Sequence, residues 1–298
     1  MKIYKLSNKF EDGGCIIKPS SEKSIFDLNK KKIVNIFKKK GIIVFKGFKI
    51  NKSSLTKFTD IFTKQYANDA LRRNSRFKDK KLHNVDPGNY EMPLHSEASY
   101  STSWPEIVWF YCNKAPKKSG QTTLCDGRAI YKNFNLDLKN FFLKNQILYN
   151  IKIPFKYNKP NLKNINNKKN LRPWYIEYPG IYDCYINLKD NYLKFKLKKY
   201  ALVKTQESNK VAFANHLQIV LDRDPQVLNI TLENNKKISK KIMNEVKKIS
   251  DDLTVQLNWK TEELCMIDNH RFMHGRKKII KNEIRDIINI QTLRANLD

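Results

Sequence analysis

The chain has 298 residues, of which 40% are hydrophobic and 11% aromatic, and this fits one large globular domain with a full-sized core. No apolar run reaches the ~18 residues that a membrane helix needs, so no membrane span is expected. Its 58 Lys and Arg against 29 Asp and Glu give a formal net charge of +29, which favours anionic partners.

The first half of the chain shows helical and strand-like patterns in turn. Apolar residues recur at helical spacing over residues 25–40, and Gly41 follows as a helix stop. Residues 41–48 are rich in β-forming residues, with glycine at the start and near the end, which predicts a buried strand. Residues 53–66 have the pattern of an amphipathic helix, and the dense apolar run at 105–112 predicts another strand.

The second half begins with a polar stretch rich in Lys, Asn and Pro at residues 156–172, which is typical of a mobile lid. Residues 238–249 predict a surface helix, whereas 254–259, 263–267 and 284–293 predict strands. No repeat or low-complexity linker divides the chain. We therefore expect a single domain over residues 1–298, mainly β, with helices packed outside the strands.

Three residues carry the strongest chemical signal. His95 and Glu97 are two positions apart, so on a strand both side chains would point to one face. His274 follows 177 residues after Glu97. Two imidazoles and one carboxylate form the facial triad of non-heme Fe(II) oxygenases, which leaves positions open for substrate and dioxygen. A single His-x-Glu arises by chance, however, and a lone histidine is more often hydrogen-bonded than metal-bound.

Further features fall in register around these residues. His95-Ser96-Glu97 is followed by Ser119-Gly120-Gln121-Thr122, by the segment 268–276 (Asp-Asn-His-Arg-Phe-Met-His-Gly-Arg) and by Arg285, 11 residues past His274. From the strand at 41–48 to Arg285, the chain resembles the TauD/TfdA family of Fe(II)/2-oxoglutarate oxygenases. The family pattern is H-x-D/E, then G-G-x-T, then D-N-x-x-x-x-H-G-R, then an arginine. Here Ser119 replaces one glycine.

The resemblance implies an α+β, mainly β fold with a double-stranded β-helix (jelly-roll) core and flanking helices. It implies that His95, Glu97 and His274 bind Fe(II), with 2-oxoglutarate as cosubstrate and O2 as oxidant, so that a substrate is oxidised with release of succinate and CO2. Arg285 offers a planar fork for the distal carboxylate of 2-oxoglutarate. Thr122 can donate its hydroxyl to the same carboxylate, although Thr123 competes for this role.

Two departures from the family pattern bear on the substrate. Glu97 stands where Asp is commoner, as in the branch similar to clavaminate synthase and asparagine oxygenase, whose substrates are amino-acid-like. Asn289 stands where some members carry a second arginine, which argues against a taurine-like sulfonate. The carboxylate at position 97 also argues against a halogenase, because related halogenases have a small residue there. Tyr100 faces either the substrate or the core.

Other polar residues of these motifs have structural interpretations. His270, four residues before His274, is expected to be a structural residue beside the site. We expect Asp268 and Asn269 to fix the turn before His274 through side-chain to backbone bonds. Arg276 is expected to hold a structural ion pair, and His83 and His216 to be ordinary residues.

The leading hypothesis is thus a dioxygenase that hydroxylates a small, polar, amino-acid-like molecule. The alternative is a basic nucleic-acid-binding protein on a jelly-roll scaffold, but interleaved Arg and aromatic residues that would stack bases are missing. The charge also fits a chain in which Lys, Asn and Ile dominate at the positions where neither fold nor function restricts the residue type. A Zn-dependent hydrolase or isomerase would not need an oxoacid clamp.

The five cysteines form no CxxC pair and the N-terminus has no apolar stretch, so we expect reduced thiols and a cytoplasmic protein. The sequence leaves the oligomeric state open, and a homo-oligomer is one alternative.

Overall fold

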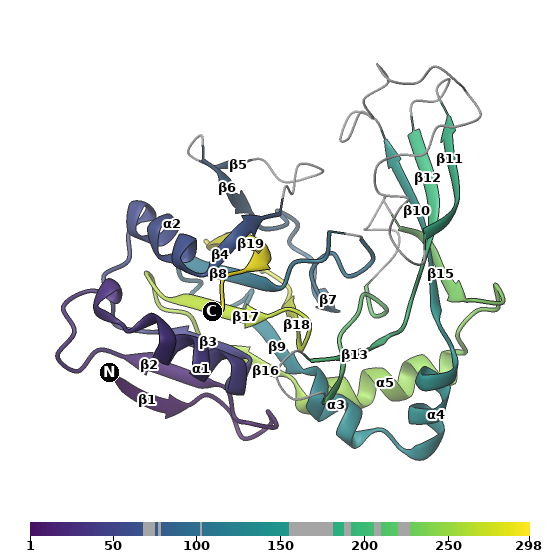
Figure 1. Cartoon of the computed structure of the whole chain (residues 1–298), viewed down its shortest axis with the longest axis horizontal. Coiled ribbons are helices and arrows are strands. Elements are labelled where there is room, and N and C mark those ends of the chain that lie inside the picture. Colours follow the sequence, from purple (N-terminus) through teal and green to yellow (C-terminus); the bar gives the residue numbers. More distant parts are fainter. Residues whose placement is uncertain are drawn as a thin grey trace.

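The computed structural model describes residues 1–67, 75–76, 79–101, 103–154, 181–187, 192–205, 210–219 and 227–298. It is mainly β, with five α-helices in these residues (Figure 1). The lid expected at residues 156–172 lies outside the described residues.

A nine-stranded sheet forms the centre of the molecule. Its strands lie in the order β1-β2-β3-β17-β8-β19-β6-β5, and β4 pairs with β19 beside this path. Its members are β1 (Lys2–Lys5), β2 (Cys15–Lys18), β3 (Ile42–Phe45), β4 (Thr63–Tyr66), β5 (Ser75–Arg76), β6 (Asp79–Asn84), β8 (Ile107–Lys114), β17 (Leu264–Asp268) and β19 (Asp286–Ala295). The runs β3, β8 and β17 are almost wholly buried, which is why their sequences read as continuous apolar stretches.

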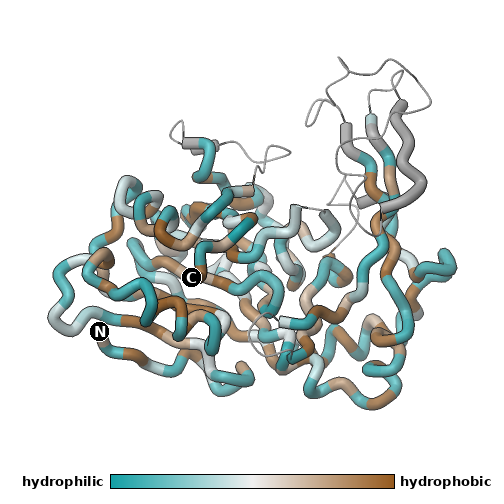
Figure 2. Tube along the Cα trace, viewed as in Figure 1, coloured by the Kyte–Doolittle hydropathy of each residue, from teal (hydrophilic) through white to brown (hydrophobic). Residues whose placement is uncertain are grey.

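A second, four-stranded sheet packs against one face of the first. Its order is β16 (Val255–Leu257), β9 (Thr122–Asp126), β18 (Phe272–Arg276) and β7 (Met92–His95). A cluster of buried side chains from both sheets fills the space between them, including Val44, Phe110, Leu124, Leu257 and Phe272. Hydrophobic residues accordingly concentrate along these inner strands (Figure 2). The two sheets therefore enclose one apolar core.

Helices α1 (Lys30–Lys40) and α2 (Lys52–Ile61) cover the opposite face of the large sheet, where they bury Ile33, Phe37, Leu55 and Phe58. Helix α1 begins after the cap Asn29, whose side chain accepts a hydrogen bond from the Lys32 backbone N–H. It ends at Gly41 in the left-handed region (φ +69°), as its sequence predicts.

The remaining helices and strands pack around a second hydrophobic cluster. Helices α3 (Gly127–Asn133), α4 (Leu136–Lys144) and α5 (Lys240–Leu253) share an apolar cluster with a further sheet, β11-β12-β10-β15. This sheet projects from the body in Figure 1. Its strands are β10 (Ile147–Pro154), β11 (Ile181–Asn187), β12 (Tyr192–Lys199) and β15 (Val227–Leu232), and a small pair, β13 (Leu202–Lys204) with β14 (Val211–Phe213), lies beside them.

Most expected elements are present with shifted ends. The helix expected over 25–40 divides into a short 3-10 helix (Ile25–Asp27) and α1. The helix expected over 53–66 is wrong in its last turn, because residues 63–66 pair with β19 as β4. Tertiary pairing there overrides the helical spacing. No helix in the described ranges is long and apolar enough to cross a bilayer.

Candidate active site

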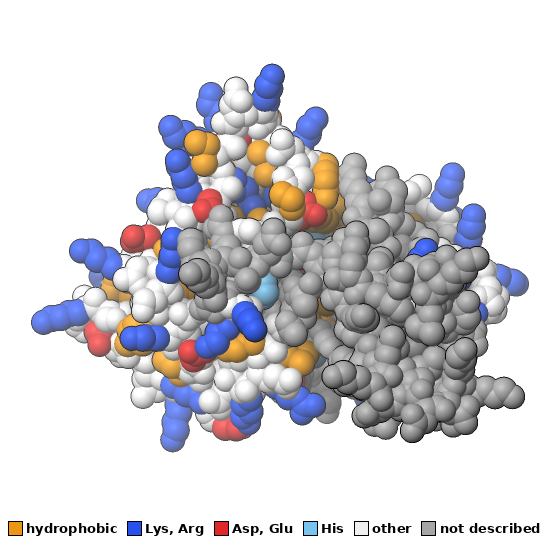
Figure 3. All heavy atoms as spheres, turned by 90° about the horizontal axis from the view of Figure 1, so that it is seen from above, with side chains coloured by type: hydrophobic (Ala, Val, Ile, Leu, Met, Phe, Trp, Pro, Cys, Tyr) orange, Lys and Arg blue, Asp and Glu red, His pale blue; other side chains and the backbone are white. Residues whose placement is uncertain are grey.

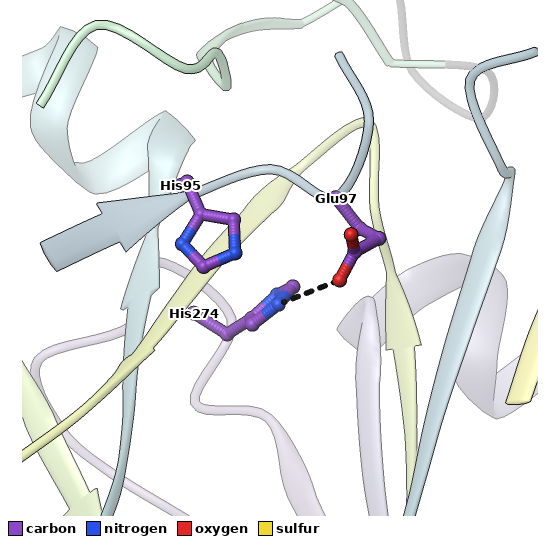
Figure 4. Close-up of side chains that lie close together, drawn as sticks. All are labelled: His95, Glu97 and His274. Carbon is purple, nitrogen blue, oxygen red and sulfur yellow. Dashed lines mark ion pairs between the residues drawn. The ribbon is translucent and has the colours of Figure 1, made fainter. Parts of the chain in front are cut away.

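The side chains of His95, Glu97 and His274 converge on one point (Figure 4). His95 is the last residue of β7 and lies directly opposite His274 of β18 in the ladder. Their ring centroids are 4.5 Å apart, and the His274 Nε2 atom lies 3.6 Å from the Glu97 Oε2 atom. One candidate ligand atom from each residue lies within 4.8 Å of the others. Two segments that are distant in the sequence thus form one compact donor set.

Glu97 does not reach this point as the sequence suggests. The alternation of a strand was expected to place His95 and Glu97 on one face, but β7 ends at His95 and Glu97 lies in a turn. The turn still directs the carboxylate toward the two imidazoles. Its conformation depends on hydrogen bonds from Asn269, which are described below.

Burial sets the protonation of the first imidazole. The pKa of His95 is lowered to about 3, first by burial and then by the neighbouring His274 and His216. Its Nδ1 atom lies 2.9 Å from the Pro93 carbonyl oxygen, so this nitrogen carries the proton and Nε2 keeps a free lone pair. A neutral imidazole beside a second imidazole and a carboxylate fits Fe(II), which favours nitrogen and oxygen donors of this kind.

The three residues line a pocket with an empty volume of about 430 Å³. The other residues of its lining are Val85, Asp86, Met92, Phe110, Thr122, Gly275, Arg276 and Arg285. The pocket therefore joins the triad to both residues expected to bind a distal carboxylate, and it includes Thr122 but not the competing Thr123.

Thr122 and Arg285 form one polar unit. Arg285 donates from Nη2 to the Thr122 hydroxyl oxygen at 3.0 Å, and Trp259 donates from Nε1 to the same oxygen at 2.8 Å. Because that oxygen accepts both bonds, the threonine proton remains available for another acceptor. Burial and the neighbouring Arg276 lower the pKa of Arg285 to about 10, which leaves it charged at neutral pH. Such a half-buried cation in the pocket wall fits an anionic group in the pocket.

Arg276 forms the ion pair that the sequence suggested, with Asp86, but its shorter contacts are to backbone carbonyls. Its guanidinium donates to the backbone carbonyls of Asp86 (2.6 Å), Gly88 and Tyr90 (3.0 Å), whereas the Asp86 carboxylate lies 3.9 Å away. The residue thus holds the 86–90 loop beside the pocket mainly through neutral acceptors.

His216 is the residue near the triad that sequence reasoning missed. Its buried ring lies edge-on to His95, with centroids 5.3 Å apart. The ring of Tyr100 also lies edge-on to His216, with centroids 4.7 Å apart. No motif marks this position, and only the fold brings it beside His95. His270, by contrast, packs on Trp104 at 4.3 Å and is not part of the three-residue donor set.

The sequence as a whole agrees with this geometry. A model of the Taurine catabolism dioxygenase TauD, TfdA family matches residues 2–288. The chain belongs to the TauD/TfdA family. The expected family is thereby confirmed, and the protein is an oxidoreductase of a dioxygenase family.

Solved structures of similar fold cover nearly the whole of this TauD/TfdA member. PvcB from Pseudomonas aeruginosa, an Fe, alpha-ketoglutarate dependent oxygenase from an isonitrile synthetic pathway, matches with a TM-score of 0.61 and 13% identity over 97% of this chain and 90% of its own. AAD-2, in complex with Mn(II) and N-oxalylglycine, matches with a TM-score of 0.60 and 12% identity over 100% and 97%. At these identities the likeness concerns the fold. No curated protein matches the chain in sequence.

Proposed function

We propose that His95, Glu97 and His274 hold Fe(II) in this enzyme and that Arg285 and Thr122 hold the distal carboxylate of 2-oxoglutarate. One observation carries the proposal: a single pocket contains the three-residue donor set and, apart from it, a half-buried arginine bonded to a buried threonine. A Zn hydrolase would use the first group and leave the second without a purpose. An oxoacid cosubstrate uses both, because it has a metal-binding end and a free carboxylate.

Each of the proposed site residues has a separate role. Together with O2, bound Fe(II) and 2-oxoglutarate would supply an oxidative decarboxylation in which one oxygen atom enters succinate, CO2 is released, and the other oxygen atom hydroxylates a substrate C–H bond. His95 stays neutral because of its burial, so it can bind metal without first losing a proton. Arg285 offsets the distal negative charge, and Thr122 donates its free hydroxyl proton. Phe110 packs edge-on against His274 at 4.9 Å and makes this wall of the pocket apolar.

The fold proposal is a double-stranded β-helix. It is supported by the two facing sheets, with His274 on β18 and His95 at the end of β7, both in the smaller sheet. We propose that residues 1–298 act as one domain, because apolar clusters connect the small sheet both to the large sheet and to helices α3 to α5.

For the substrate we propose a small, polar, amino-acid-like molecule. Glu97 in place of the commoner Asp supports this choice by its resemblance to the amino-acid-oxidising branch. Asn289, where some members carry arginine, is buried, and its amide lies 3.4 Å from the Trp109 carbonyl oxygen. That position supplies no cation for a sulfonate. His216 lies edge-on to His95 and Tyr100 lies edge-on to His216, and we propose that both contact the substrate.

The large positive charge does not require a nucleic-acid partner. Lys and Arg side chains project all round the described part of the face in Figure 3 rather than gathering in one stripe. We propose that this charge mainly reflects composition. Affinity for DNA or RNA that falls steeply with salt and competes with 2-oxoglutarate would contradict this view.

Succinate formation tests the function. Purified protein with Fe(II), 2-oxoglutarate and ascorbate is screened against free amino acids and their simple derivatives, and we expect substrate-stimulated succinate and CO2. The matched control is Glu97→Gln, which keeps the size of the side chain and removes its charge. If wild type neither binds nor consumes 2-oxoglutarate, even without substrate, the proposal is wrong.

A further inference from the structure

The turn that carries Glu97 needs support from outside itself. It follows the end of β7, so no strand pairing fixes its backbone beyond His95. Ala98, the residue after Glu97, has φ +51°, a left-handed conformation that is uncommon for residues other than glycine. A short turn with such a residue persists only when surrounding contacts determine it.

Other residues hold the turn on either side of Glu97. The Ser96 N–H donates to the Asn215 carbonyl oxygen, and Lys199 donates to the carbonyl oxygens of Ser99 and Ser101.

Asn269 supplies the contacts at Glu97 itself. Its Oδ1 atom accepts a hydrogen bond from the Glu97 backbone N–H at 2.8 Å, and its Nδ2 atom donates to the Glu97 carbonyl oxygen at 2.9 Å. The same Nδ2 donates to the Pro105 carbonyl oxygen at 2.9 Å, where the turn segment leads into β8. One carboxamide thus brackets both backbone groups of the carboxylate ligand, in the manner of a paired strand.

Asn269 is itself rigidly held. It is fully buried, and its backbone N–H donates to the Glu106 carbonyl oxygen at 3.0 Å. Ser96 donates from its hydroxyl to the Asn269 carbonyl oxygen at 2.7 Å and accepts from Trp104 Nε1 at 2.8 Å. Asp268 alone caps the following turn, by accepting from the His270 N–H at 3.0 Å, so the expectation that both residues fix that turn was half right.

We infer that Asn269 is a positioning residue, which sets the place of the Glu97 carboxylate before any metal binds. The position needs one acceptor and two donors, and only an amide side chain of this length provides them. Aspartate would present a second acceptor to two carbonyl oxygens in a buried place, which is strongly unfavourable. The inference rests on the proposed metal role of Glu97.

Metal binding by the metal-free protein tests the inference without catalysis. Mn(II) is titrated into wild type and Asn269→Asp, and the free ion is followed by electron paramagnetic resonance. We expect the Kd of Asn269→Asp to rise about 10- to 100-fold, as for other partners of metal ligands. The matched control is Asn150→Ala, a buried asparagine bonded to Asn229 in the projecting sheet, which should lose stability and keep its Mn(II) affinity.

A milder variant covers the case in which Asn269→Asp fails to fold. Ser96→Ala removes the hydroxyl proton that is shared between the Asn269 carbonyl oxygen (2.7 Å) and its Oδ1 atom (3.2 Å). It should raise the Kd for Mn(II) about fivefold, the effect of one hydrogen bond. A folded Asn269→Asp protein, or else a Ser96→Ala protein, with wild-type affinity would overturn this inference alone. Failure of wild type to bind Mn(II) would overturn the proposed function as well.

Discussion

The β7–β18 ladder and the turn at residues 96–101 bring metal-binding side chains to the same point by different means. His95 and His274 are direct partners in a ladder, so backbone pairing fixes their separation whatever side chains lie nearby. Glu97 is held by the side chain of Asn269, 172 residues away in the sequence. The ladder half of the site should therefore tolerate changes in its surroundings, whereas the turn half should depend on single residues.

The largest effect is expected on the ladder side, from removal of a ligand itself. His274→Ala leaves the backbone pairing in place and removes one of two imidazoles, so the fold should remain while Mn(II) binding and 2-oxoglutarate turnover fall to background. The loss should exceed the ~100-fold upper range for a residue that only supports a ligand. Circular dichroism melting checks the fold, and appreciable metal binding by a folded variant would exclude His274 as a ligand.

The turn side is probed by Glu97→Asp, which keeps the charge and shortens the side chain by one methylene. Because Asn269 fixes the backbone of residue 97, the turn cannot move to restore the reach of the carboxylate. We expect 2-oxoglutarate turnover to drop on the order of 100-fold, the cost of a misplacement of about 1 Å. Succinate assays measure it. Wild-type turnover would mean that the turn adjusts, and the contrast with the ladder would then disappear.

The same contrast recurs at the other end of the pocket. Thr122 belongs to strand β9, whereas Arg285 lies in the segment before β19. Arg285→Ala should raise the KM for 2-oxoglutarate roughly 30-fold, because a half-buried charge partner contributes about 2 kcal/mol, the lower end of the range for buried pairs. Arg285→Lys keeps the charge but lacks the planar guanidinium fork, so its KM should lie between those of wild type and Arg285→Ala. A KM that stays constant in both variants would place the cosubstrate carboxylate elsewhere.

Sequence patterns were informative where the chemistry lies in the ladder. The motifs that resemble the TauD/TfdA pattern predicted the convergence of His95, Glu97 and His274, and Thr122 was preferred over Thr123. The hydrogen bonds between Asn269 and the Glu97 backbone could not be predicted, because no local pattern shows that an asparagine 172 residues later contacts this residue.

Helices and strands could likewise be predicted where local residues determine them, and not where a distant partner does. Helix α1 carries its own cap and glycine stop, so its C-terminal end could be predicted. Residues 63–66 continue a helical pattern, but they pair with β19, a partner more than 200 residues further along the chain. His216 was missed for the same reason, since only its place in the fold sets it beside His95.

The smallest expected effect concerns Asp268, which ends β17 just before Asn269 and so joins the two regions. Burial raises its pKa to about 6, and the bond from the His270 N–H and the charge of Arg271 offset only part of this. The folded state therefore holds the proton more tightly than the unfolded chain. Between about pH 4 and pH 6 this group lowers the free energy of unfolding as pH rises, and above pH 6 the full penalty remains.

Asp268→Asn keeps an oxygen acceptor for the His270 N–H and cannot ionise. Relative to wild type, its free energy of unfolding should rise from pH 4 to pH 7 by about 1 kcal/mol, measured by urea unfolding at several pH values. Asp268 is only half-buried, so solvent screening reduces the roughly 2 kcal/mol that this rise in pKa would give in a dry interior. Asp251→Asn on α5, an exposed residue paired with Lys247, should give no such trend. If the two variants behave alike, burial at the junction does not destabilise the carboxylate, and the junction is as tolerant of substitution as the ladder.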